Sequence, residues 1–175
     1  MFVWFYKLIA SGLVIFASSM TGFSVARSYR ERPRHLRAMQ SVLQGLATEI
    51  SYGATPLPEA FAHLGRTSQR PVADLFFAAE ETLRQPGSTA NEAWQRGLER
   101  LAESSALLKS DLSILSQLGS QLGLSDRQDQ ERHLLLAVQQ LAREESRAEE
   151  ARQSNERMWR YLGVLSGILL VIVLV

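Results

Sequence analysis

Hydrophobic and polar residues are distributed unevenly along the chain. An uncharged, mainly apolar stretch stands near each end, from Leu8 to Ala26 and from Tyr161 to Val175, and a polar region lies between them. A helix needs about 20 apolar residues to cross the hydrocarbon core of a bilayer, and Trp159 and Arg160 lengthen the second stretch at the interface. The pattern therefore predicts a membrane helix at each end of the chain.

The charges beside the first stretch predict the orientation. Only Lys7 precedes it, whereas five arginines follow it, namely Arg27, Arg30, Arg32, Arg34 and Arg37. Basic residues stay on the cytoplasmic side of a membrane. We therefore expect four segments: residues 1–7 as a short extracytoplasmic tail, 8–26 as a transmembrane helix, 27–159 as one cytoplasmic domain and 160–175 as a transmembrane helix.

Each of the two membrane predictions has an alternative. The first stretch also has features of a cleaved signal peptide, with Ala17-Ser18-Ser19 as the cleavage site. The second stretch could be a buried terminal helix, although it has no polar face. If both stretches span, Ser18 and Gly22 would face Gly167 and Gly163 in an antiparallel hairpin, because small residues let helices approach closely in membranes.

The region between the stretches has the pattern of helices. Leu36, Met39, Leu43, Leu46 and Ile50 recur at steps of three and four residues. This spacing predicts a helix that begins at Pro33, where proline suits the first helical position, and ends at Tyr52-Gly53.

Further helix starts follow from prolines and capping residues. Pro56 and Pro71 each precede an apolar helical face, and Thr89 with Glu92 forms the pattern of a capping box. Two more helices are expected, one from Leu108 to Gly123 and one after a second capping pattern at Ser125 and Gln128.

The last helix has no proline or glycine between Ser125 and Gly163 and should continue unbroken into the membrane, over about 70 Å. Its charged part, from Arg143 to Arg157, is predicted to be either a solvated stalk or an antiparallel coiled coil against the Leu36–Ile50 helix. The predicted fold is all-α: a cytoplasmic bundle of about six helices with a transmembrane helix at each end.

Composition gives no sign of catalysis. The net charge of +1 does not favour nucleic-acid binding, and the absence of cysteine excludes disulfides and thiolate ligands. The three histidines, His35, His63 and His133, have no second ligand at metal spacing. Phosphate-binding loops and nucleophile elbows are missing too. We therefore expect no catalytic, cofactor or metal residues, and a function in binding and assembly.

A set of fixed-spacing residues resembles a known family. The matching positions are Thr21-Gly22-Phe23, Ala26, Tyr29, Arg32-Pro33, Leu36-Arg37, Leu46, Glu49-Ile50, Tyr52-Gly53, Thr55-Pro56-Leu57, Glu59-Ala60, Trp94, Leu118-Gly119, Leu122-Gly123, Asp126 and Gln130. At these positions the chain is similar to the stage III sporulation protein AB family over nearly its whole length. The aromatic-rich start, Met1 to Tyr6, departs from the family.

The resemblance implies a function. It implies a platform component of the mother cell–forespore channel apparatus of endospore-forming bacteria, in the mother-cell membrane around the forespore. That family is similar to the inner-membrane platform proteins of type II secretion and type IV pilus machines. The implied partners are an ATPase like stage III sporulation protein AA, other membrane proteins of the channel and membrane lipids; self-association is left open. The alternative hypothesis is a generic membrane-anchored helical scaffold or adaptor unrelated to secretion.

The family-motif residues are also candidates for a partner surface. They are Thr21, Phe23, Arg32, Pro33, Arg37, Glu49, Tyr52, Thr55, Pro56 and Leu57. A plainer interpretation takes Thr55-Pro56-Leu57 as a helix start. The arginines from Arg27 to Arg37 are interpreted as a topology signal and anionic-lipid contact in preference to an ATPase-binding site.

Overall fold

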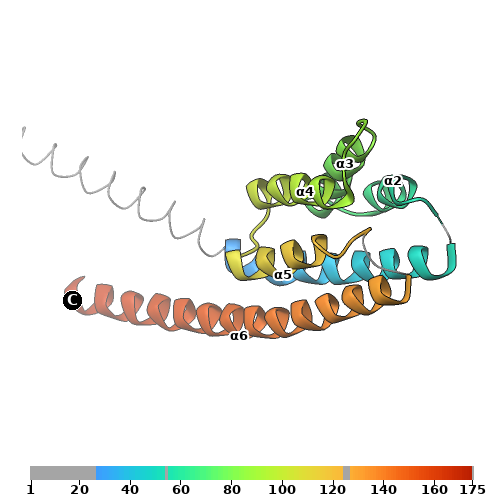
Figure 1. Ribbon diagram of the computed structural model, residues 1–175. Coiled ribbons are helices and arrows are strands. Elements are labelled where there is room, and N and C mark those ends of the chain that lie inside the picture. The colour runs from blue at the N-terminus through green and yellow to red at the C-terminus, as the bar shows by residue number, and fades with distance from the viewer. Residues whose placement is uncertain (1–26, 54, 124–126, 175) are drawn as a thin grey trace, which may run out of the picture. The chain divides into compact units, whose positions relative to one another are not determined.

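The computed structural model describes the backbone of residues 27–53, 55–123 and 127–174, with most side chains as far as Met158. Every element in this described part is a helix, as Figure 1 shows. The all-α class expected from the sequence is confirmed. The chain divides into two compact units: Glu31–Glu150 is the larger, and Met1–Arg30 with Ala151–Val175 forms the other.

The two stretches expected to be membrane helices differ in how far the structure describes them. Residues 1–7 and 8–26 lie outside the described residues. Of residues 160–175, the backbone is helical as far as Leu174. Within the described part of the chain, no helix combines the length and the apolar character that a membrane crossing requires.

The first described helix, here called the N-terminal helix, covers residues 27–48 and ends in a π-helical turn, η1 (Glu49–Gly53). The predicted start at Pro33 is wrong, because residues 27–32 are already helical and Pro33 is buried inside the helix. A proline at such a position removes one backbone hydrogen bond. The boundary between the two units, after Arg30, falls within one turn of it.

Prolines and capping residues mark the next helix starts as expected. α2 (Leu57–Thr67) follows Pro56, and α3 (Val72–Leu83) follows Pro71. α4 (Ala90–Ser104) begins with the predicted capping box, in which the backbone N–H of Thr89 donates to Glu92 Oε2 at 3.0 Å and Thr89 Oγ1 accepts from the backbone N–H of Glu92 at 3.2 Å.

The fifth helix is shorter than predicted. α5 covers Lys109–Gly119, and a turn follows it as far as Gly123, whose φ is +79°. α6 (Arg127–Leu174) is continuous over 48 residues, as expected, which corresponds to about 72 Å. The predicted cap at Ser125 lies outside the described residues.

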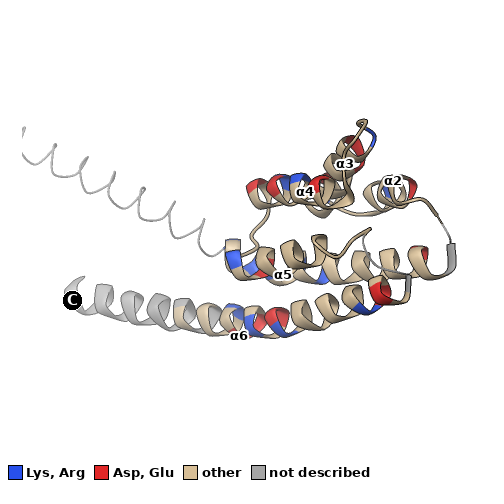
Figure 2. Ribbon diagram, viewed as in Figure 1, with Lys and Arg blue, Asp and Glu red and all other residues tan. Residues whose placement is uncertain are grey.

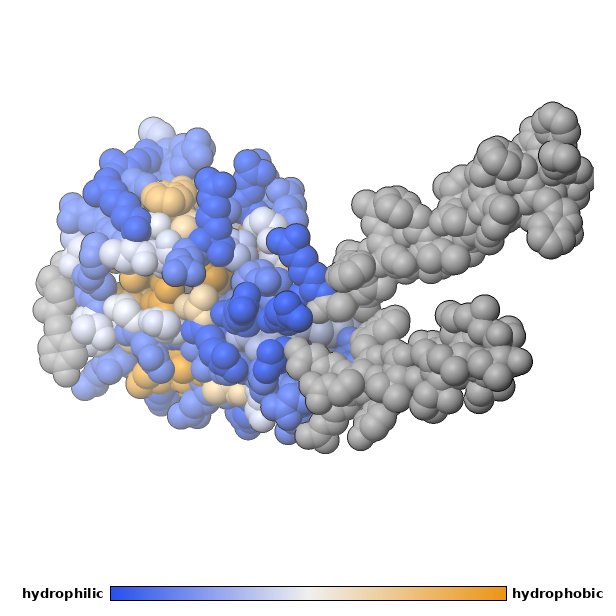
Figure 3. Space-filling model, turned by 180° about the vertical axis from the view of Figure 1, so that it is seen from behind, coloured by the Kyte–Doolittle hydropathy of each residue, from blue (hydrophilic) through white to orange (hydrophobic). Residues whose placement is uncertain are grey.

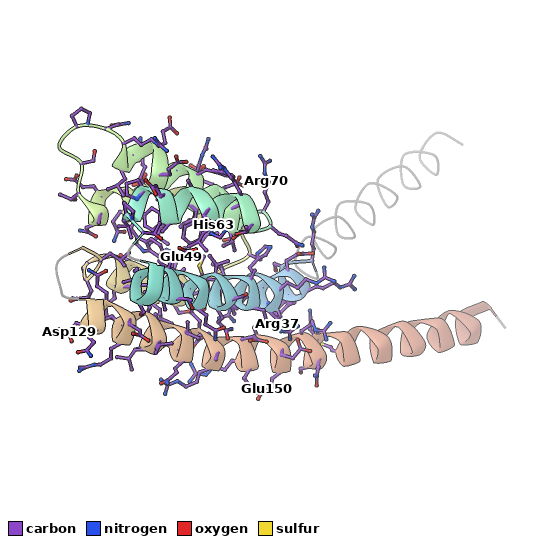
Figure 4. All side chains as sticks on the ribbon, turned by 90° about the vertical axis from the view of Figure 1, so that its right-hand side faces the viewer. Arg37, Glu49, His63, Arg70, Asp129 and Glu150 are labelled. Atoms are coloured by element: carbon purple, nitrogen blue, oxygen red, sulfur yellow. The ribbon has the colours of Figure 1, made fainter. Side chains whose placement is uncertain are left out.

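The N-terminal helix is the central layer of the larger unit. Figures 1 and 4 show α2, α3 and α4 on one side of it and the first part of α6 on the other. A Cβ added at Gly45 would stand 3.3 Å from Leu64 Cδ2 of α2, and Ser51 Oγ donates to Glu131 Oε2 of α6 at 2.7 Å. Leu36, Met39, Leu43 and Leu46, which recur at helical spacing, are fully buried.

Three aromatic side chains fill the core where α2, α3 and α4 meet. Phe61, Phe76 and Trp94 are each fully buried, with ring centroids 5.7–6.1 Å apart. Two of the three pairs have the edge-to-face geometry that aromatic rings prefer. Trp94 Nε1 donates to the carbonyl of Leu115 at 2.7 Å, which joins α4 to α5.

Candidate functional site

Some predicted site residues cannot be compared with the structure. Ser18, Thr21, Gly22 and Phe23 lie outside the described residues. Gly163 and Gly167 lie in the helical backbone of α6. Close packing between these two groups of small residues stays a prediction.

Arg32 is an interior residue, although it belongs to a run of exposed arginines. Its side chain is 14% exposed. Arg32 Nε donates to Asp111 Oδ2 at 2.9 Å and Nη2 donates to Oδ1 at 2.8 Å. Nη2 also donates to Glu144 Oε2 at 3.0 Å. Hydrogen bonding to Asp111 outweighs the opposing effect of burial and raises the pKa of Arg32. The residue joins the N-terminal helix to α5 and α6.

Asp111 is the one fully buried charged side chain among the described residues. Besides the two bonds from Arg32, its Oδ2 accepts from the backbone N–H of Leu108 at 2.8 Å, at the start of α5. A buried carboxylate is costly unless it is paired and hydrogen-bonded. Asp111 meets both conditions, and the two-pronged geometry is the strong form of an arginine–carboxylate pair.

A second set of polar contacts continues along the N-terminal helix and α6. Arg37, labelled in Figure 4, pairs with Glu145 and lies 3.5 Å from Glu149. Gln40 Nε2 donates to Glu145 Oε2 at 2.8 Å. Figure 2 shows acidic and basic residues interspersed along this part of α6.

These contacts fix the relative direction of the two helices. Arg37 contacts Glu145, and Ser51 contacts Glu131. The residue number rises along one helix and falls by the same amount along the other, so the two helices are antiparallel. The antiparallel pairing of the two helices, which is part of one of the two expectations for α6, is thus confirmed as far as Glu149.

Glu49 links the end of the N-terminal helix to α2. Its Oε1 lies 3.0 Å from His63 Nδ1, and its Oε2 accepts from Thr55 Oγ1 at 3.1 Å. Figure 4 shows Glu49 and His63 on facing elements. Pro56 is exposed, whereas Leu57 is half-buried against the core. Glu49 and Thr55 are half-buried, so Pro56 is the exposed residue of this turn, whereas Arg32 is half-buried and Pro33 is buried.

His35 is held neutral by its surroundings. Burial lowers its pKa, as does the charge of Arg34 to a smaller extent, whereas the charge of Glu31 acts in the opposite direction. Its Nδ1 accepts from the backbone N–H of Ala106 at 3.1 Å, which requires an unprotonated nitrogen.

Two hollows that the sequence did not indicate open on the surface of the larger unit. The α3–α4 hollow is rich in charge, and the α5–α6 groove is lined by uncharged residues and one histidine. The hollow is lined by Arg70, Asp74, Phe77, Ala78, Glu81, Thr82, Gln85, Arg96, Glu99, Arg100, Glu103 and Ser104. The groove is lined by Ile114, Gln117, Leu118, Gln121, His133, Leu136, Ala137 and Gln140.

The face of the molecule opposite to the view of Figure 1 is mainly hydrophilic (Figure 3). Figure 3 shows separate hydrophobic patches among hydrophilic residues on the side facing away from the view of Figure 1. Within the part of the chain that the structure describes, no group of three or more histidine, aspartate or glutamate side chains could hold a metal ion.

Sequence reasoning missed Asp111 and Glu144. Asp111 stands in the first turn of α5, where acidic residues are common on exposed surfaces. Its partner Arg32 is 79 residues away. One local signal was available. An acidic residue three positions after the N-cap, as Asp111 is after Leu108, can accept a hydrogen bond from the backbone N–H of the N-cap residue.

Comparisons with known proteins agree with one another. The family described as "Stage III sporulation protein AB" matches residues 7–175. The chain is 38% identical to stage III sporulation protein AB of Bacillus subtilis (strain 168), over 96% of this chain and 98% of that protein. A solved structure of stage III sporulation protein AB matches with a TM-score of 0.67 and 36% identity, covering 71% of this chain and 98% of the solved one.

Proposed function

This chain belongs to the stage III sporulation protein AB family, and on that basis we propose that it is a membrane platform of the mother cell–forespore channel apparatus in endospore formation. In this proposal it couples a cytoplasmic ATPase, like stage III sporulation protein AA, to the membrane proteins of the channel. The proposal assigns it a role in binding and assembly, with no reaction of its own.

The observation that carries the proposal is where the chain enters and leaves the larger unit. Arg32 contacts Glu144, and Arg37 contacts Glu145 and Glu149, so the two ends of the Glu31–Glu150 unit lie at the same end of the helical pair. The uncharged stretches 8–26 and 161–175 adjoin these two ends in sequence. A domain held at both ends by one membrane needs this arrangement.

In the proposed topology the larger unit is cytoplasmic and residues 8–26 and 160–175 cross the membrane. A protease-protection assay on cells with a tag at each terminus tests it. We expect both tags to be cleaved from outside and the middle of the chain to be protected. Cleavage of the middle in intact cells would contradict the topology, and loss of the N-terminal tag from the mature protein would favour the signal peptide.

The turn from Glu49 to Leu57 is the proposed ATPase-binding end. It lies about 27 Å along the N-terminal helix from Glu31, since 18 residues separate Glu31 from Glu49. A turn at that distance from the proposed anchors is accessible to a soluble protein. Thr55 and Pro56 belong to this turn, and Pro56 is exposed. Of the arginines from Arg27 to Arg37, the exposed Arg27, Arg30 and Arg34 are assigned to anionic lipid, because Arg32 and Arg37 pair with acidic residues of α5 and α6.

A pull-down with the ATPase encoded in the same operon tests this end. The full chain in detergent should retain the ATPase, and Pro56→Arg should weaken retention at least tenfold, about the effect of losing one good interface contact. Pro86→Arg is the matched control, because Pro86 is an exposed proline in another loop that also precedes a helix. Equal binding by both variants would remove this turn from the proposal, and no binding by the folded wild-type chain would favour the generic scaffold.

A further inference from the structure

Two apolar side chains are exposed on different helices of the larger unit. Phe77 of α3 is 42% exposed and Leu136 of α6 is 43% exposed. Phe77 borders the α3–α4 hollow, and Leu136 lines the α5–α6 groove. Figures 1 and 4 show α3 and α6 on opposite sides of the N-terminal helix.

Acidic residues flank Phe77 on its own helix. Asp74 and Glu81 stand three residues before it and four residues after it, so all three share one face of α3. Glu81 pairs with no described residue. Asp74, whose side chain is 28% exposed, pairs with the exposed Arg70 at 3.3 Å, and such a pair near the surface is a weak interaction in water. Phe77 therefore stands between two carboxylates that are available to a partner.

Basic residues flank Leu136 in the same manner. Arg132 and Arg143 stand four residues before it and seven residues after it, on the same face of α6. Neither arginine pairs with any residue in the described ranges. The groove beside Leu136 is lined by glutamines, aliphatic residues and His133. This surface is thus an uncharged groove between two unpaired cations.

We propose that a second copy of this chain occupies the α5–α6 groove and places its Phe77 against Leu136. Glu81 and Asp74 of that copy then face Arg132 and Arg143. An exposed aromatic residue is a common anchor of interfaces, and opposite charges around it set the register and suppress wrong partners. The contact is head to tail, because each copy uses a different surface.

The positions of the two surfaces allow the contact to repeat. The two surfaces have no lining residue in common, so one copy can use both at once. Chains anchored in one membrane must keep their long helices side by side; to this extent the inference rests on the proposed function. A head-to-tail contact gives a closed ring or an open row.

Crosslinking of the full chain in its membrane tests the contact. The chain has no cysteine, so each introduced cysteine is a unique thiol. Ala78→Cys places one in the α3–α4 hollow and Gln140→Cys places one in the α5–α6 groove, while Phe77 and Leu136 are kept. With a short bismaleimide, a mixture of the two single variants should give a dimer. The double variant should give a ladder of oligomers, and each single variant alone should give none.

The control and the charge test define failure. Leu108→Cys, at another exposed leucine, should not crosslink to Ala78→Cys. Glu81→Arg should weaken dimer formation at least about tenfold, and a partner carrying Arg132→Glu and Arg143→Glu should restore it. No product from the mixture, or equal product from one single variant alone, would overturn the inference. ATPase retention in the pull-down is a separate measurement, so the failure of one proposal is distinguishable from the failure of the other.

Discussion

Gly119 of α5 lies directly against Trp94 of α4. A Cβ built on Gly119 would stand 2.2 Å from Trp94 Cδ1, far inside van der Waals contact. The indole cannot move aside easily, because Trp94 is fully buried between Phe61 and Phe76 and its Nε1 donates to the carbonyl of Leu115. The aromatic core therefore requires glycine at this position.

Gly119→Ala should lower the free energy of unfolding by about 1–3 kcal/mol, the usual cost of overpacking. Gly45→Ala is the matched control, because its Cβ would meet only the end of the Leu64 side chain at 3.3 Å and alanine favours a helix. Chemical unfolding of the full chain in detergent, followed by circular dichroism, measures both. Equal effects would show that the core accommodates a methyl group at Gly119.

Asp111→Ala should destabilise the bundle by about 3 kcal/mol or more, because it leaves Arg32 buried with only Glu144 as a partner. Glu103→Ala, which removes one member of an exposed pair with Arg100, should change stability by less than about 0.5 kcal/mol. The same unfolding measurement compares the two. An equally small change at Asp111 would mean that water replaces the lost carboxylate.

Stability should fall as the pH decreases through the range where histidine titrates. The pKa of His35 is lowered in the folded chain, so the unfolded chain binds the proton first. The contribution of His35 is fully present above about pH 6.5, its unfolded pKa, and is lost as the pH falls through the folded pKa. His35→Asn keeps an acceptor for the N–H of Ala106 without a titrating group. Unfolding curves from pH 8 to pH 5.5 should therefore be flatter for this variant, and an unchanged slope would assign the titration elsewhere.

The proposed membrane helices should pack on their small residues. If the antiparallel register of Arg37 with Glu145 continued towards the chain ends, Gly22 would fall within about one helical turn of Gly163. Gly22→Cys and Gly163→Cys in one chain should form an intramolecular crosslink in membranes, and Phe16→Cys with Gly163→Cys should form it less efficiently. A crosslink that is absent in every preparation would exclude the Ser18–Gly22 and Gly163–Gly167 hairpin.

Much of the helical layout follows from local signals. Pro71 and the Thr89–Glu92 capping box mark helix starts because each acts on the backbone groups of its own first turn. Gly87, with φ of +83°, marks the turn before α4 because it adopts a backbone conformation that other residues avoid. The antiparallel pairing was one of two alternatives that the sequence left open for the charged part of α6, and the contacts of Arg37 with Glu145 and Glu149 decide between them.

What could not be predicted depends on contacts between distant residues. α5 ends at Gly119 and not at Gly123, and Gly119 is the residue packed against Trp94 of another helix. In the sequence Arg32 is one of five similar arginines. It differs from the others because it binds Asp111, which is 79 residues away in the chain. The sequence predicts a helix start at Pro33 because no strong local signal shows that residues 27–32 are helical.

One carboxylate oxygen links the start of α5 to the N-terminal helix. Leu108, at the start of α5, has no side-chain oxygen with which to cap the helix, so the first turn depends on Asp111 Oδ2. The same oxygen accepts from Arg32. Without Arg32, burying the Asp111 carboxylate would cost more free energy than leaving it in water. The first turn of α5 would then lack its stabilising contact. An isolated peptide of this helix should consequently be mostly unstructured, and in the whole chain its start should become stable when Arg32 meets Asp111, 79 residues along the chain.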